Sequence, residues 1–133
     1  MPTSRRSTRS TTQKKAVADF ISLLFTSRTQ AHILHLQTES FAKHKALNKY
    51  YDAIVDLTDK YAEAYQGIYG IIEGYKASGK FKEGEKSVAY FQKLERDVKA
   101  MKTKLPKDVD LENIYADILE LIHSTTYLLK ELN

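Results

Sequence analysis

The sequence has no cysteine and no tryptophan among its 133 residues, and it has only two prolines and five glycines. The absence of cysteine excludes disulfide frameworks, thiolate zinc sites, iron–sulfur clusters and cysteine nucleophiles. No apolar run approaches the roughly 18 residues that a membrane-spanning helix needs. The first ten residues also lack the apolar stretch of a secretory signal. We therefore expect a soluble, cytoplasmic protein with enough chain for one domain and a sizeable core.

Motifs of several catalytic classes are also missing. The five glycines lie between residues 67 and 84, at spacings that fit neither a P-loop nor a dinucleotide-binding loop. The sequence contains no Gly-x-Ser-x-Gly nucleophile elbow and no His-Glu-x-x-His zinc motif. Hydrolase and nucleotide-binding classes that depend on these motifs are excluded.

Positive charge is concentrated at the N-terminus. The formal net charge is +4, yet residues 1–15 hold five basic residues and no acid. We predict a disordered basic arm over residues 1–13, because serine, threonine and arginine offer almost no apolar surface to bury. The bundle domain would then span residues 14–133. Such an arm could contact phosphates of DNA without reading sequence, through Arg5, Arg6, Arg9, Lys14 and Lys15.

Outside the glycine-rich stretch, the turn at residues 37–40 and the break near Pro106, apolar residues recur with helical spacing. No segment alternates long enough to indicate a strand. The two short turns predict antiparallel hairpins, and the glycine-rich stretch is long enough to cross a bundle. The predicted fold is an all-α, ferritin-like four-helix bundle, with helices over residues 12–36, from residue 41 into the glycine-rich stretch, over 83–104 and over 108–132.

One apolar stripe on each helix is predicted to form the core. On the first helix this stripe ends at His35, and on the second it runs from Leu47 to Ile68. Ser40 is expected to cap the start of the second helix. We expect the nine tyrosines to be core and interface residues rather than redox relays.

Three of the four histidines lie close to the turn between the first two helices. His32 and His35 are one turn apart near the end of the first helix, and His44 is one turn into the second. An antiparallel hairpin brings these ends together, and converging imidazoles can bind a divalent transition metal.

Four carboxylates form a stripe along the second helix: Asp52, Asp56, Asp59 and Glu63. A solvated outer face is the simplest interpretation of this stripe. As metal ligands, Asp59 and Glu63 cannot join the histidines of their own chain, because Asp59 lies ~22 Å from His44 along a straight helix. Two copies with antiparallel second helices, paired about a twofold axis, could complete one site.

The spacing His32-x11-His44-x14-Asp59-x3-Glu63 resembles the ferroxidase pattern of the Dps family, the twelve-subunit mini-ferritins. Residues 34–44 also resemble the junction between the first two helices of that family. This sequence departs from the family pattern by having Leu36 in place of a tryptophan.

The resemblance implies a protein that binds and oxidises Fe²⁺ at a site between subunits, a ferroxidase, with dioxygen or peroxide as oxidant. Ferric iron would be stored inside a hollow dodecamer, and another divalent metal such as zinc could occupy the site. The implied ligands are His35 or His32 with His44 from one subunit, and Asp59 and Glu63 from its partner. Near the site would lie Asn48, where the family has an acid, together with Asp52 and Asp56.

Three alternatives remain open. Glu120 and His123 form a Glu-x-x-His pair of the kind found in di-iron bundles, although such a site needs a second copy that this sequence lacks. The protein could instead be a nucleic-acid-binding bundle that acts through its basic arm. It could also be a structural helical bundle without a metal.

Overall fold

The computed structural model describes residues 3–77, 79–84 and 86–131, with side chains described from residue 11 onward. This part of the chain is all-helical and has no strand, which confirms the predicted fold class of a four-helix bundle. No helix within it is long and apolar enough to cross a membrane. The elements are α1 (Thr3–Gln37), α2 (Phe41–Tyr69), α3 (Ser87–Met101), a short 3₁₀ helix η1 (Lys102–Lys104) and α4 (Val109–Glu131).

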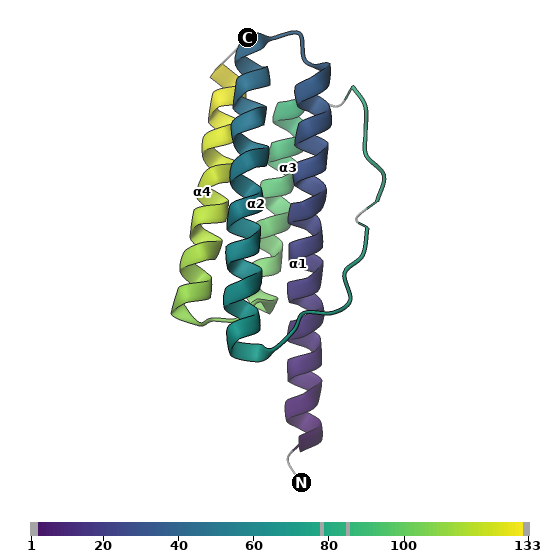
Figure 1. The fold of residues 1–133 in the computed structure, drawn as a ribbon, viewed down its shortest axis with the longest axis vertical. Coiled ribbons are helices and arrows are strands. Elements are labelled where there is room, and N and C mark those ends of the chain that lie inside the picture. The colour runs from purple at the N-terminus through teal and green to yellow at the C-terminus, as the bar shows by residue number, and fades with distance from the viewer. Residues whose placement is uncertain (1–2, 78, 85, 132–133) are drawn as a thin grey trace.

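The helices form two antiparallel hairpins, α1–α2 and α3–α4, and a long connection joins them (Figure 1). This connection, residues 70–86, starts at one end of the bundle and reaches the other end along the outer side of α1. As a result, α2 and α3 run in the same direction. The predicted pair of hairpins with a crossover between them is therefore observed.

Hydrogen bonds hold the crossover against α1 along much of its length. The Lys76 amide donates to Ser22 Oγ at 3.2 Å, and the Gly84 amide donates to Gln37 Oε1 at 3.0 Å. Between them, the Gln30 amide group makes two bonds with the main chain of Lys82: Oε1 accepts at 2.9 Å and Nε2 donates at 2.8 Å. Ser22 and Gln30 are buried, so they replace the water that would otherwise satisfy this irregular backbone.

The first helix begins earlier than predicted. Its backbone is helical from Thr3, whereas periodicity placed the start near Thr12. The N-terminal turns of α1 project beyond the ends of the other helices (Figure 1). The side chains of Arg5, Arg6 and Arg9 lie outside the described part of the chain, and the division into an arm and a bundle domain stays a prediction.

Local sequence signals explain the other helix boundaries. Ser40 caps α2 as predicted, because its backbone is extended and its side chain accepts a hydrogen bond from the Lys43 amide at 3.2 Å. The second helix ends at Tyr69 and is followed by Gly70, which has φ 98°. The third helix starts at Ser87 rather than near Glu83. Gly84 has φ 67°, a left-handed conformation that cannot lie inside an α-helix.

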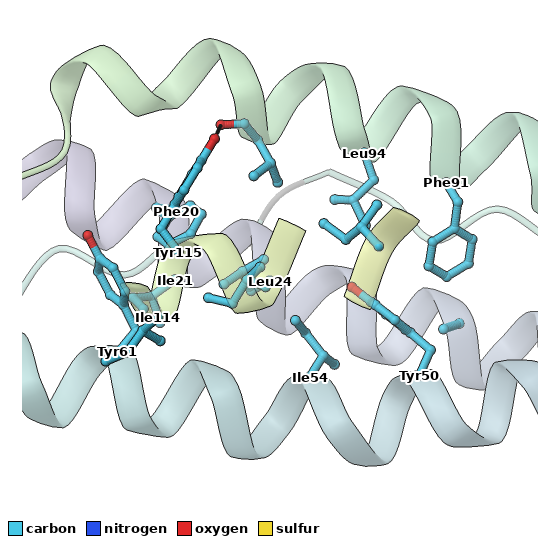
Figure 2. Packing of buried hydrophobic residues seen from close by; sticks show 14 of the residues in the cluster. Phe20, Ile21, Leu24, Tyr50, Ile54, Tyr61, Phe91, Leu94, Ile114 and Tyr115 are labelled. Atoms are coloured by element: carbon cyan, nitrogen blue, oxygen red, sulfur yellow. Dashed lines mark hydrogen bonds between the residues drawn. The ribbon is translucent and has the colours of Figure 1, made fainter. Parts of the chain in front are cut away.

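Aromatic and aliphatic side chains from all four helices fill the core (Figure 2). Phe20 of α1 packs edge-on against Tyr61 of α2 with ring centroids 5.1 Å apart, and Tyr50 packs edge-on against Phe91 at 4.7 Å. The Tyr50 hydroxyl shares a 2.7 Å hydrogen bond with Ser27 Oγ, so this polar group is satisfied inside the core.

The predicted core is wrong at one position of α2. Ile68 is 47% exposed in the last turn of the helix. Tyr69 packs against the core and Ile72 is buried, so these two residues take the inward positions where the helix gives way to the crossover. The predicted stripe assumed that helical spacing continued inward to the end of the helix.

Candidate functional site

The turn between α1 and α2 brings two of the predicted metal ligands into contact. The Thr38 amide continues the helical pattern by donating to the Leu34 carbonyl at 3.0 Å, and the Ser40 amide donates to Thr38 Oγ1 at 3.2 Å. This three-residue turn reverses the chain. It places His35 in the last turn of α1 beside His44 in the first turn of α2.

The rings of His35 and His44 stack with centroids 3.5 Å apart and planes 23° apart. His35 Nδ1 lies 2.7 Å from the His44 carbonyl oxygen, and His44 Nδ1 lies 2.8 Å from the His35 carbonyl oxygen. A carbonyl can only accept, so each Nδ1 carries the hydrogen. In the neutral rings each Nε2 then keeps its lone pair, which is the tautomer that metal-binding histidines show when a carbonyl holds the other nitrogen.

His32 lies beside this pair but makes different contacts. Its ring is 5.8 Å from that of His35 and stacks on Tyr51 of α2 at 4.3 Å. The Tyr51 hydroxyl donates to Asn48 Oδ1 at 2.8 Å, and Asn48 Nδ2 donates to Asp52 Oδ2 at 2.9 Å. The structure thus connects His32, Asn48 and Asp52 through Tyr51, a residue that the sequence analysis did not place at the site. The sequence does contain a signal for Tyr51, because a residue three positions after Asn48 lies on the same face of the helix.

The remaining predicted ligands lie elsewhere on α2. Asp56, Asp59 and Glu63 are exposed farther along the helix and do not join the histidines. Across the described residues, no group of three or more histidine, aspartate or glutamate side chains could hold a metal ion. The carboxylates and the histidines of one chain are therefore separated, as expected from the ~22 Å between His44 and Asp59 along α2.

The exposed side of α2 carries more lysines near the histidine end and more carboxylates toward the crossover, with Asp52 and Lys60 as exceptions. Lys45 and Lys49 lie near the histidine end, whereas Asp59 and Glu63 lie toward the crossover. Apolar side chains are exposed beyond both halves: Leu36 (71%) and Phe41 (74%) at the histidine end, and Ile68 (47%) and Ile71 (69%) at the other. If a second copy of this surface is turned end for end, its lysine-rich part faces the carboxylate-rich part of the first copy, and apolar ends face apolar ends. The surface is therefore complementary to a second copy of itself.

The Glu120–His123 pair on α4 makes a different contact from the one that a di-iron site needs. His123 Nε2 lies 3.0 Å from Glu95 Oε1 of α3, and Lys99 Nζ lies 3.2 Å from Glu95 Oε2. His123 therefore forms a polar link between α3 and α4, while Glu120 is exposed.

Most of the tyrosines are core residues, as predicted. Tyr50, Tyr61 and Tyr65 are almost fully buried, and burial raises the pKa of each hydroxyl above its ordinary value. The Tyr69 hydroxyl donates to Asp108 Oδ1 at 2.7 Å, and this bond raises the pKa of Tyr69 to about 12. These groups are neutral at physiological pH, which suits a packing role.

These features define an all-α, four-helix bundle protein whose first hairpin presents imidazole and carboxylate groups on α2. The chain belongs to a family of unknown function (DUF5856), which matches residues 35–129. The matched range includes His35, His44, Asp59 and Glu63.

One relative is an "Uncharacterized 14.6 kDa protein in mobD-ri intergenic region" of Enterobacteria phage T4. It is 36% identical over 52 residues, which is 39% of this chain and 41% of the phage protein. The alignment thus spans less than half of that relative. No solved structure matches the chain.

Proposed function

We propose that this protein is a Dps-like mini-ferritin that binds and oxidises Fe²⁺ at a site shared by two subunits. The observation that carries this proposal is the His35–His44 pair, whose Nδ1 atoms are bonded to carbonyls and whose Nε2 atoms remain for a metal. The topology supports it, because two hairpins joined by one long crossover are the arrangement of ferritin-like bundles.

The distribution of charge on α2 supports an antiparallel pair of these helices. If a twofold axis crosses the exposed side of α2 at the level of Ile54, Lys45 of one subunit lies opposite Glu63 of the partner subunit, and Lys49 lies opposite Asp59. The same register brings His44 opposite Ala64, beside Glu63 of the partner subunit. These two pairs bring opposite charges together, and the apolar side chains exposed near the two ends of α2 meet.

In this arrangement each site receives nitrogen ligands from one subunit and oxygen ligands from the other. We assign His35 and His44 as the nitrogen ligands, because a carbonyl orients both rings, and Asp59 and Glu63 as the oxygen ligands. Imidazole with carboxylate suits iron and also accepts zinc. The shared register places Asp52 opposite Asp56, and these acids would attract cations to the site.

Storage of the ferric product requires an enclosed volume, so the proposal includes a closed shell of twelve subunits. The basic arm would add non-specific DNA binding, since α1 projects beyond the bundle at its N-terminus (Figure 1). A truncated chain that lacks residues 1–13 should then lose the gel shift that the full chain gives with duplex DNA at low salt. Equal shifts by both would remove this part of the proposal.

The proposal is tested by Fe²⁺ oxidation under air, followed by absorbance of the ferric product. We expect His44→Ala, Asp59→Asn and Glu63→Gln each to lose rapid oxidation while keeping the helical circular dichroism of the wild type. His123→Ala is the matched control, because this histidine lies on α4 outside the proposed site, and it should oxidise Fe²⁺ at the wild-type rate. Undiminished oxidation by His44→Ala and Glu63→Gln would show that these residues do not form the site.

A further inference from the structure

Three aromatic side chains are exposed around one cavity beside the crossover. Tyr75 (49% exposed) and Phe81 (48%) come from the crossover, and Phe25 (43%) comes from α1. The rings of Phe25 and Tyr75 are 6.4 Å apart. The cavity measures about 380 Å³, and hydroxyl side chains of α1 line its floor: Ser22, Thr26 and Thr29. Clustered exposed aromatics that frame a hollow indicate a binding surface.

Lysines alternate with the aromatic residues in this part of the crossover. Residues 74–82 contain three lysines and two aromatic residues, and glutamates flank them at positions 73, 83 and 85. Lys76 lies at the cavity and pairs with Asp19 at 3.2 Å. Lys80 and Lys82 line an adjoining cavity of about 110 Å³ on the other side of the crossover.

Basic residues continue from the crossover onto α3. Lys93 lines the adjoining cavity together with Asp97, to which it is paired at 3.7 Å. Residues 86–107 as a whole hold seven lysines and arginines against two acids. Basic side chains therefore lie next to the aromatic cavity, at the adjoining cavity, farther than a single nucleotide would need.

We propose that the crossover binds single-stranded nucleic acid, with unpaired bases stacked on Tyr75, Phe81 and Phe25. The Thr29 hydroxyl at the cavity offers a hydrogen bond to a base edge, and Lys80 at the adjoining cavity contacts a phosphate that follows. Aromatic rings interleaved with lysines are the usual means of binding single strands without sequence preference. A duplex cannot use these rings, because its base faces are already stacked. This site is independent of the iron chemistry, and it differs from the arm, which can contact only backbone charge.

The test is fluorescence anisotropy of the full chain with a labelled twenty-nucleotide oligothymidine and with a duplex of equal length. Loss of one stacked base costs about 5- to 160-fold in affinity. We expect the Tyr75→Ala/Phe81→Ala variant to bind the oligothymidine at least tenfold more weakly and the duplex less than twofold more weakly. Tyr127→Ala is the matched control, because this tyrosine is 64% exposed on α4, and it should bind both as the wild type does.

A second variant tests the phosphate contact. Lys80→Gln should lower the salt dependence of oligothymidine binding by about 0.7 in log–log slope, the value for one lost contact with a single strand. The proposal is overturned if the Tyr75→Ala/Phe81→Ala variant binds the oligothymidine unchanged, or if it loses affinity for the duplex by the same factor. It is also overturned if that variant changes the native mass, since the rings would then lie between copies of the chain.

Discussion

His35 and His44 each bond to the other's carbonyl through Nδ1, so the backbone of the α1–α2 turn determines the tautomer and direction of both rings. Helical spacing predicted that these residues lie close together. It could not predict the reciprocal bonds, because these depend on the path of three turn residues. His32 had the family spacing, yet the structure places it against Tyr51 instead. The sequence thus indicated that the histidines lie together at the turn, but it did not distinguish His32 from His35 as the candidate metal ligand on α1.

Substitution of the two candidates separates them. We expect His35→Gln to lose most Zn²⁺ binding in calorimetric titration, because it removes an oriented Nε2. His32→Gln should keep binding within about threefold, since its ring is held by stacking on Tyr51 rather than by a carbonyl. The opposite pattern, with binding lost in His32→Gln and kept in His35→Gln, would reverse the ligand assignment.

The tyrosines make stability sensitive to alkaline pH. The pKa of Tyr69 rises from 10.0 to about 12 in the folded state through its bond to Asp108. The unfolded chain therefore releases this proton first, so the contribution of Tyr69 is complete below pH 10 and is lost as pH rises toward 12. Urea unfolding at several pH values should show a free energy of unfolding that declines across this window.

Tyr69→Phe provides the control for this prediction. The variant should be about 1 kcal/mol less stable at pH 7, because it loses one partly exposed hydrogen bond. Its decline above pH 10 should be shallower than that of the wild type, although the other buried tyrosines still contribute. Identical slopes for the two proteins would show that the Tyr69–Asp108 bond does not control the pH dependence.

At the scale of elements, the glycine-rich stretch, the Ser40 cap and the helical spacing of apolar residues were enough to predict four helices and two hairpins. The path of the crossover was not predictable. It is held by Ser22, Gln30 and Gln37, polar residues of α1 whose partners are main-chain groups far along the chain. No local pattern marks such a contact. The start of α1 was missed for a related reason, since residues 3–11 have no apolar stripe to indicate a helix.

Gln30 should be the most important of these anchors, because it is 3% exposed and bonds to both main-chain groups of Lys82. We expect Gln30→Ala to lower the free energy of unfolding by about 1–3 kcal/mol, the range for leaving buried polar groups unsatisfied. Amide hydrogen exchange at Lys82 should also become faster. Gln92→Ala, at an exposed position on α3, is the control and should change neither quantity. Unchanged exchange at Lys82 in Gln30→Ala would contradict the role of this anchor.

At the scale of the whole molecule, the proposed site is completed only by assembly. Twelve copies of the 15.3-kDa chain would give a particle of about 180 kDa with closed symmetry. The α2 surface, with Lys45 and Lys49 toward one end and Asp59 and Glu63 toward the other, is the feature of the single chain that favours such pairing. Within one copy the histidines and the carboxylates lie too far apart along α2 to bind the same metal ion.

The most direct test of this shared site is complementation between two inactive subunits. His44→Ala and Glu63→Gln subunits, refolded together in equal amounts, form mixed pairs in which one of the two sites keeps both its histidines and its carboxylates. Random pairing then predicts Fe²⁺ oxidation at about one quarter of the wild-type rate, whereas each variant alone stays inactive. A mixture as inactive as the separate variants, although native mass shows mixed oligomers, would contradict a site shared between subunits.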